Sequence, residues 1–112
     1  MMKKREIQLY LMARLDITVA GYDMIIKFLE LTEQYPIDRP LPMMKLYERV
    51  RRAFGKSKLN VCQEIHTCIR NSVSQMEQNP FQPCPTNKEF LHRLRLELWK
   101  ADLLAEHHKP MV

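Results

Sequence analysis

The stretch "MMKLYERVRRAFGKSK", residues 43–58, combines two signals that decide the fold of this chain. Apolar side chains at Met43, Tyr47, Val50 and Phe54 recur at steps of three and four, the period of an α-helix with one face in a core. Gly55 follows directly, and glycine readily ends a helix in the left-handed conformation. We therefore predict a helix from Met43 to Phe54, with Tyr47 and Phe54 in the core, followed by a short turn through "GKSK".

The segment before this helix has the same period. Its apolar positions are Met12, Leu15, Val19, Tyr22, Ile26 and Leu29. Because the phase continues unchanged through Gly21, we favour one long helix from about residue 4 to residue 34, or two nearly collinear ones. The alternative is two helices broken near residues 16–21, where the β-branched Ile17, Thr18 and Val19 would form a short extended link.

Two more helical segments follow, separated by prolines. The apolar period returns over residues 59–78, and a last helix over residues 86–107 opens with Thr86 and Glu89 spaced as a capping box. The stretches "YPIDRPLP" (residues 35–42) and "NPFQPCP" (residues 79–85) each hold three prolines, which a helix interior does not tolerate. We predict an all-α fold: a small bundle of four or five helices with proline-rich crossovers, forming a single helical domain over residues 1–112.

The composition is that of one ordinary globular domain. The chain has 112 residues, of which 46% are apolar and 28% charged, so it has the apolar surface that a disordered segment lacks. No apolar run approaches the roughly 18 residues of a membrane span. The three cysteines are an odd number, and no apolar secretory region follows the basic start. We expect a cytoplasmic protein with reduced thiols.

The net charge of +5 comes from one place. Between Lys45 and Lys58 there are six basic residues and one acid, whereas the rest of the chain holds twelve basic and twelve acidic residues. We call these six residues the cationic ridge: Lys45, Arg49, Arg51, Arg52, Lys56 and Lys58. On a helix, most of them face away from the apolar stripe, so they would be free to follow a phosphate backbone.

The leading hypothesis is therefore a small, possibly regulatory, nucleic-acid-binding protein whose ridge contacts phosphates, with little sequence preference unless Asn60 or Gln63 reads bases. Three alternatives stay open: a merely solvated helix face, an acidic protein partner, or anionic lipid headgroups. A standard helix-turn-helix aligned on Gly55 is disfavoured, because Arg51 and Glu64 occupy positions that such a motif buries.

The last helix carries two apolar stripes. One contains Leu91, Leu94, Leu98, Ala101 and Ala105, and the other contains Leu96, Trp99 and Leu103. A lone surface helix needs only one stripe, so the second predicts a homodimer interface, with central burial in a monomeric bundle as the alternative. The alternative function is that of a dimeric adaptor or protein-interaction module. In it this surface binds a protein partner, and the ridge only guides the approach of the two proteins.

Catalytic signals are weak. Cys62 and His66 are four residues apart on a helix, and Cys84 or His92 would have to complete a metal site, but this spacing is common by chance. We interpret the cysteines as core filler or incidental thiols, and the Cys62–His66 site as buried thiols beside a half-exposed imidazole. The sequence has no phosphate-binding loop, dinucleotide turn or paired-carboxylate motif, so we predict no enzyme activity, no metal site and no cofactor.

Overall fold

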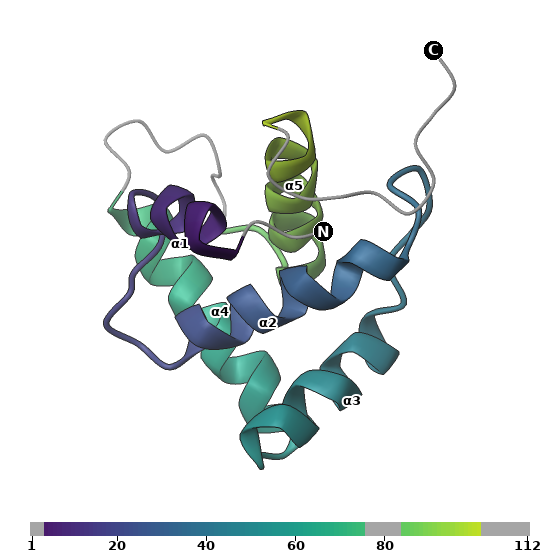
Figure 1. Ribbon diagram of the computed structural model, residues 1–112. Helices are drawn as coiled ribbons and strands as arrows, with labels where there is room; N and C mark the ends of the chain where they lie inside the picture. The colour runs from purple at the N-terminus through teal and green to yellow at the C-terminus, as the bar shows by residue number, and fades with distance from the viewer. Residues whose placement is uncertain (1–3, 76–83, 102–112) are drawn as a thin grey trace.

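Helices make up the whole of the regular structure that the computed structural model describes, which covers residues 4–75 and 84–101 (Figure 1). In chain order they are α1 (Lys4–Met12), α2 (Gly21–Leu31), the 3-10 helix η1 (Thr32–Gln34), α3 (Met43–Phe54), α4 (Lys58–Ser74) and α5 (Asn87–Lys100). No strand occurs in these two ranges. The predicted all-α class, with five α-helices, is confirmed.

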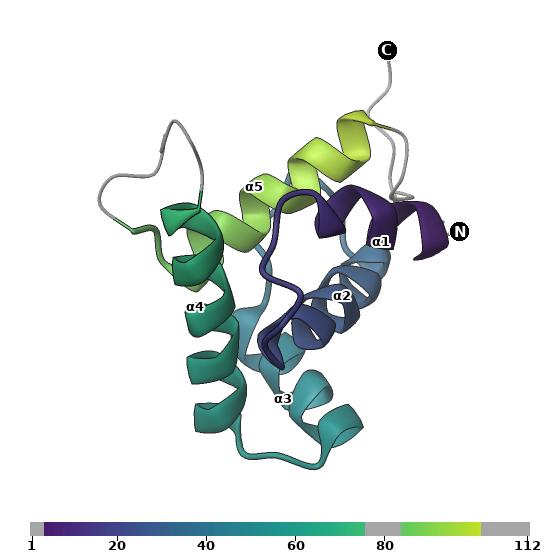
Figure 2. The same cartoon turned by 90° about the vertical axis from the view of Figure 1, so that its left-hand side faces the viewer.

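The core forms where α2, α3 and α4 pack against one another, with α5 lying on α4 and α2. Side chains without exposed surface fill this centre, among them Ile25, Phe28, Leu46, Val50, Ile65, Ile69 and Leu98. Helix α1 lies beside α5 at the end of the molecule opposite the α3–α4 turn (Figures 1 and 2). The hydroxyl of Tyr10 donates a hydrogen bond to Glu97 across that contact, at 3.4 Å.

The favoured single N-terminal helix is wrong: α1 ends at Met12 and α2 begins at Gly21. The alternative of two helices is confirmed, although the link between them consists of turns and bends and is not extended. Asp16 explains the break. Its Oδ1 accepts hydrogen bonds from the backbone N–H of Thr18 (3.0 Å) and from the Thr18 hydroxyl (2.5 Å), a local bonding pattern that competes with helix. Its backbone N–H donates to Ser72 Oγ (2.9 Å), and Asn71 donates to its Oδ2 (3.0 Å), which ties the turn to α4.

Gly21 starts α2 at a point where that helix touches the α4 backbone. A Cβ atom at this position would lie 2.1 Å from the carbonyl oxygen of Glu64 and 2.9 Å from Cβ of Cys68. Only glycine therefore allows α2 and α4 to approach this closely.

A buried arginine fixes the start of the first proline-rich crossover, residues 35–42. Arg95 of α5 has 1% of its surface exposed, and its guanidinium donates to the carbonyls of Thr32 (3.4 Å) and Tyr35. These carbonyls lie at the end of the α2–η1 segment, where a cation interacts favourably with the terminal carbonyls of a helix. Sequence patterning does not single out Arg95.

The ends of the later helices follow local signals. Helix α3 has the predicted bounds, and Gly55 adopts φ 64° with its amide bonded to the Arg51 carbonyl. Helix α4 begins after Ser57, whose hydroxyl accepts from the Asn60 amide at 3.1 Å, and ends at Ser74; the predicted end at residue 78 lies outside the described residues. Thr86 and Glu89 form the predicted capping box on α5.

The α5 box holds the Glu89 carboxylate against the Thr86 amide and hydroxyl, and these hydrogen bonds lower the pKa of Glu89. The predicted continuation of α5 to residue 107 lies outside the described residues. In the parts of the chain that are described, no helix combines the length and the apolar character that a bilayer crossing demands.

Candidate nucleic-acid interface

Helix α3 separates the four apolar positions of its predicted stripe from its cationic residues, with one exception among those four. Leu46, Tyr47 and Val50 are buried, whereas the Lys45 and Arg49 side chains are exposed. The exception is Phe54, expected in the core but 36% exposed.

The exposure of Phe54 has a simple geometric cause. Phe54 shares the helical angle of Tyr47 but is the last residue of α3, directly before the surface turn at Gly55. The buried side of α3 is centred on Leu46, with no exposed surface, and not on Phe54.

Glu48 is the anion at the centre of the cationic ridge. Arg51 donates two hydrogen bonds to it, from Nε and from a terminal nitrogen, each 2.8 Å long. Arg52 Nε lies 3.2 Å and Lys58 Nζ 3.4 Å from the same carboxylate. The hydrogen bond from Arg51, helped by the charges of Arg51 and Lys58, lowers the pKa of Glu48 to about 2. Glu48 therefore stays ionised and orients three cations of the ridge.

The remaining ion pair of the ridge joins it to α4. Lys56 Nζ lies 3.0 Å from Glu64 Oε1. The six cations of the ridge are thus accompanied by two carboxylates, those of Glu48 and Glu64, so the ridge keeps a net positive charge. Arg52 is 71% exposed at its side chain, and ion pairs of such exposed groups contribute little, about 0–1 kcal/mol, so phosphate oxygens can displace its partner.

Lys45 and Arg49 differ from the other four cations. Within the described parts of the chain, no carboxylate lies within 4.0 Å of either side chain. Both line a shallow hollow of about 400 Å³, together with Tyr35, Met44, Glu48 and Lys58. The ridge therefore contains a concave place where cations from α3 and from the start of α4 meet.

Helices α3 and α4 are joined by only three residues, 55–57, and meet at an angle (Figure 2). This arrangement fits the general description of two helices joined by a short glycine-containing turn. Arg51 and Glu64, the two mismatches to a standard helix-turn-helix, are partly exposed and ion-paired, and not buried. Asn60 and Gln63 are exposed on α4, so both side chains are accessible next to the ridge.

The Cys62 carbonyl and the His66 ring both form hydrogen bonds to Asn87 of α5. His66 Nδ1 lies 3.2 Å from Asn87 Oδ1, and Asn87 Nδ2 donates to the Cys62 carbonyl at 3.1 Å. Nowhere in residues 4–75 and 84–101 do three His, Cys, Asp or Glu side chains group closely enough to hold a metal ion. Next to this network, burial raises the pKa of Tyr47 to about 12.

The second apolar stripe of α5 lies at the edge of the core. Leu91, Leu94 and Leu98 belong to the core cluster, whereas Leu96 and Trp99 are partly exposed. Leu103, the third residue expected at a dimer interface, lies outside the described residues.

Sequence reasoning identified the cations of the ridge but not the residues that shape it. Glu48 had a usable signal, because an acid three and four residues before Arg51 and Arg52 is the spacing of helical ion pairs. Tyr35 and Met44, which wall the hollow, had none, since Tyr35 comes from the crossover and meets α3 only in three dimensions.

Comparison with known proteins supplies no relative: no family model, no curated protein and no solved structure matches this chain significantly.

Proposed function

We propose that this protein binds nucleic acid through the cationic ridge, by contacts to the phosphate backbone, and that it acts without catalysing a reaction. The observation that supports this most is the hollow at Lys45 and Arg49, where two cations without carboxylate partners in the described chain lie beside Lys58. Cations in such a position attract an external anion, and a phosphate is the anion that a row of them suits best.

The dimensions of α3 support a contact with several phosphates. Lys45 and Arg52 are seven residues apart, about 10 Å along the helix axis at 1.5 Å per residue. Phosphates of one strand of duplex DNA follow one another at about 3.4 Å along the duplex axis, so this length faces about three of them. Arg51, already oriented by two hydrogen bonds to Glu48, would add a directed donor.

A merely solvated helix face is the main competing explanation, and the ion pairs of Glu48 and Glu64 agree with it only in part. Such a face typically alternates acids and bases that neutralise each other. Here Glu48 and Glu64 offset two cations, and the exposed Lys45 and Arg49 lie together on the same hollow. This clustering of surplus charge favours a polyanionic partner, which the protein would meet in the cytoplasm.

Titration of labelled duplex DNA, duplex RNA and single-stranded DNA into the full chain, followed by fluorescence anisotropy at two salt concentrations, tests the proposal. We expect binding at low salt that weakens steeply as salt increases, with little difference between sequences. Absence of binding to all three polymers at low salt would eliminate it.

A second candidate function is protein contact through α5, including self-association into a homodimer. It is favoured by the partly exposed Leu96 and Trp99, because aromatic anchors of this kind are enriched at interfaces. Sedimentation equilibrium should then show a dimer that Trp99→Ala dissociates, whereas Leu9→Ala, at an exposed leucine of α1, leaves it intact. A monomer at high protein concentration would remove self-association.

A further inference from the structure

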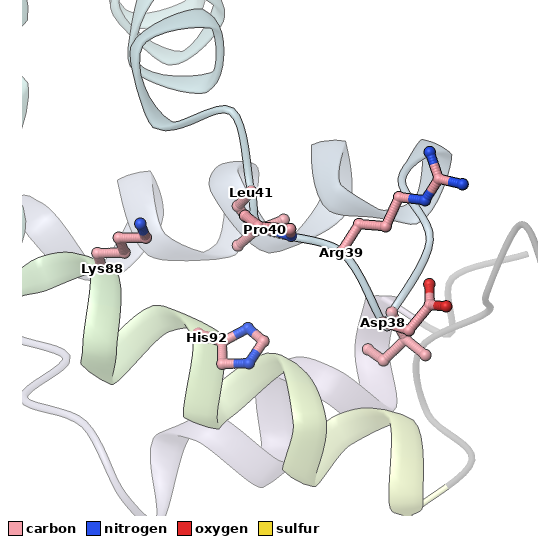
Figure 3. Close-up of a pocket in the computed structure, with 7 residues that line it drawn as sticks. Asp38, Arg39, Pro40, Leu41, Lys88 and His92 are labelled. Atoms are coloured by element: carbon pink, nitrogen blue, oxygen red, sulfur yellow. The ribbon is translucent and has the colours of Figure 1, made fainter.

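A second surface pocket lies between the first crossover and α5, and it shares no lining residue with the cationic hollow. Residues 37–41 form one wall, and Lys88 and His92 of α5 form the other (Figure 3). Its volume is about 430 Å³, within the range of about 300–1,000 Å³ that small-molecule sites occupy.

Buried residues and backbone contacts hold both walls of this pocket in place. Ile37 and Leu41 are buried, and between them Asp38, Arg39 and Pro40 are exposed. The prolines restrict the backbone of the crossover, and Arg95 anchors its start through the Tyr35 carbonyl. The opposite wall is the first half of α5, whose start the Thr86–Glu89 box fixes. A ligand would therefore meet a largely preformed site.

The charges around the pocket select an anion. Lys88 and His92 are four residues apart on one side of α5, and no carboxylate of the described chain pairs with either. Lys88 is also in the first turn of α5, where the helix dipole adds positive potential. Asp38 is the one carboxylate among the lining residues, and Figure 3 shows it directed away from Lys88 and His92.

The apolar part of the pocket selects the rest of the ligand. Pro40 and Leu41 lie opposite Lys88 and His92 in the close-up (Figure 3), and Ile37 is the third apolar residue that lines the pocket. A planar or compact apolar body can pack against these side chains while its charged group faces α5. We propose that this pocket binds a small organic anion, an apolar body with one carboxylate, independently of the nucleic-acid contact proposed for the ridge.

Benzoate is a suitable probe, and benzyl alcohol is its neutral counterpart of nearly the same size. Each is titrated into the 15N-labelled full chain, and amide chemical shifts are followed by NMR. We expect saturable benzoate shifts at the amides of residues 37–39, 41, 88 and 92, with a dissociation constant in the roughly millimolar range of so small a ligand. Benzyl alcohol should bind more weakly at the same residues.

Two lysine variants separate a built site from general charge. Lys88→Gln should weaken benzoate binding about fivefold, the effect of one partly solvated charge contact. Lys100→Gln removes the same charge from the far end of α5 and should leave binding unchanged. The proposal is overturned if benzoate gives no saturable shifts at these residues, if benzyl alcohol binds as tightly, or if both variants behave alike.

Discussion

Replacement of Gly21 by alanine tests the close packing on which the helical core depends. The new Cβ atom would lie 2.1 Å from the Glu64 carbonyl oxygen and 2.7 Å from its carbonyl carbon, and real Cβ contacts essentially never fall below 3.0 Å. The atoms it meets belong to the α4 backbone, which cannot rotate away as a flexible side chain would. Helices α2 and α4 must therefore separate by about 0.9 Å.

The cost of that separation follows from the side chains packed between the two helices. Ile25, Ile65 and Cys68 have no exposed surface, and a gap of about 0.5–1 Å forfeits a quarter to a half of each dispersion contact. Overpacking of this kind costs about 1–3 kcal/mol, occasionally more. Alanine regains at most about 1 kcal/mol of helix propensity. Because the clash is with backbone, we expect the upper end of that cost, and therefore a net loss of about 2 kcal/mol in the free energy of unfolding.

Urea unfolding followed by far-UV circular dichroism measures this loss, and Gly55 supplies the control. A Cβ at Gly55 meets nothing within 4 Å, so Gly55→Ala should cost only the left-handed backbone strain at φ 64°, about 1–2 kcal/mol. Asparagine tolerates that conformation, so Gly55→Asn should recover part of the loss, whereas Gly21→Asn should not. A Gly21→Ala protein as stable as the wild type would refute the close approach of α2 and α4.

Three further predictions concern single side chains. Arg95→Met should destabilise the protein by about 1–3 kcal/mol in the same urea assay, because it removes a buried donor from backbone carbonyls. The control Arg93→Met, at an exposed site of the same helix, should change stability by less than about 0.5 kcal/mol. Thr86→Ala should cost about 1 kcal/mol through loss of the capping box, and Thr86→Ser should cost almost nothing; equal losses would contradict the box. The pKa of Glu48 in the folded protein lies below the ordinary value of 4.5, so the stability that this carboxylate contributes is present above pH 4.5 and is lost as the pH falls toward 2. In a pH series of unfolding curves, Glu48→Gln should therefore lose less stability over that interval than the wild type.

Several features of the fold could be predicted because their causes are local. The bounds of α3 follow from its apolar period and from Gly55, and the start of α5 follows from Thr86 and Glu89, three residues apart. Each of these signals is complete within a few residues.

The break after α1 could not be predicted with the same means. The apolar period runs through it, and the Asp16 turn is held by Ser72 and Asn71, which are 56 and 55 residues away. The burial of Arg95 has the same origin, because its acceptor carbonyls at Thr32 and Tyr35 precede it by 63 and 60 residues. These features depend on tertiary contacts that a periodic pattern does not contain.

In the candidate site too, features with local causes could be predicted and features that depend on tertiary contacts could not. The surplus of cations between Lys45 and Lys58 is visible in the sequence, and so is the spacing of Glu48 to Arg51 and Arg52, but the pairing of Lys56 with Glu64 is not. Glu64 reaches Lys56 from the next helix, and Tyr35 walls the hollow from the crossover. The pocket at Lys88 and His92 was likewise invisible, since it needs the crossover and α5 side by side.

The most direct test of phosphate binding by the ridge compares two double variants with equal net charge. Lys45→Gln/Arg49→Gln empties the hollow of its unpaired cations, and Arg5→Gln/Lys100→Gln removes two charges from α1 and the end of α5, far from the α3–α4 turn (Figure 1). The measurement is the slope of log affinity against log salt for duplex DNA. Each lost phosphate contact reduces the slope by about 0.9, so the first variant should lose about 1.8 and the second almost nothing. Equal slopes for the two variants would contradict phosphate binding at the ridge.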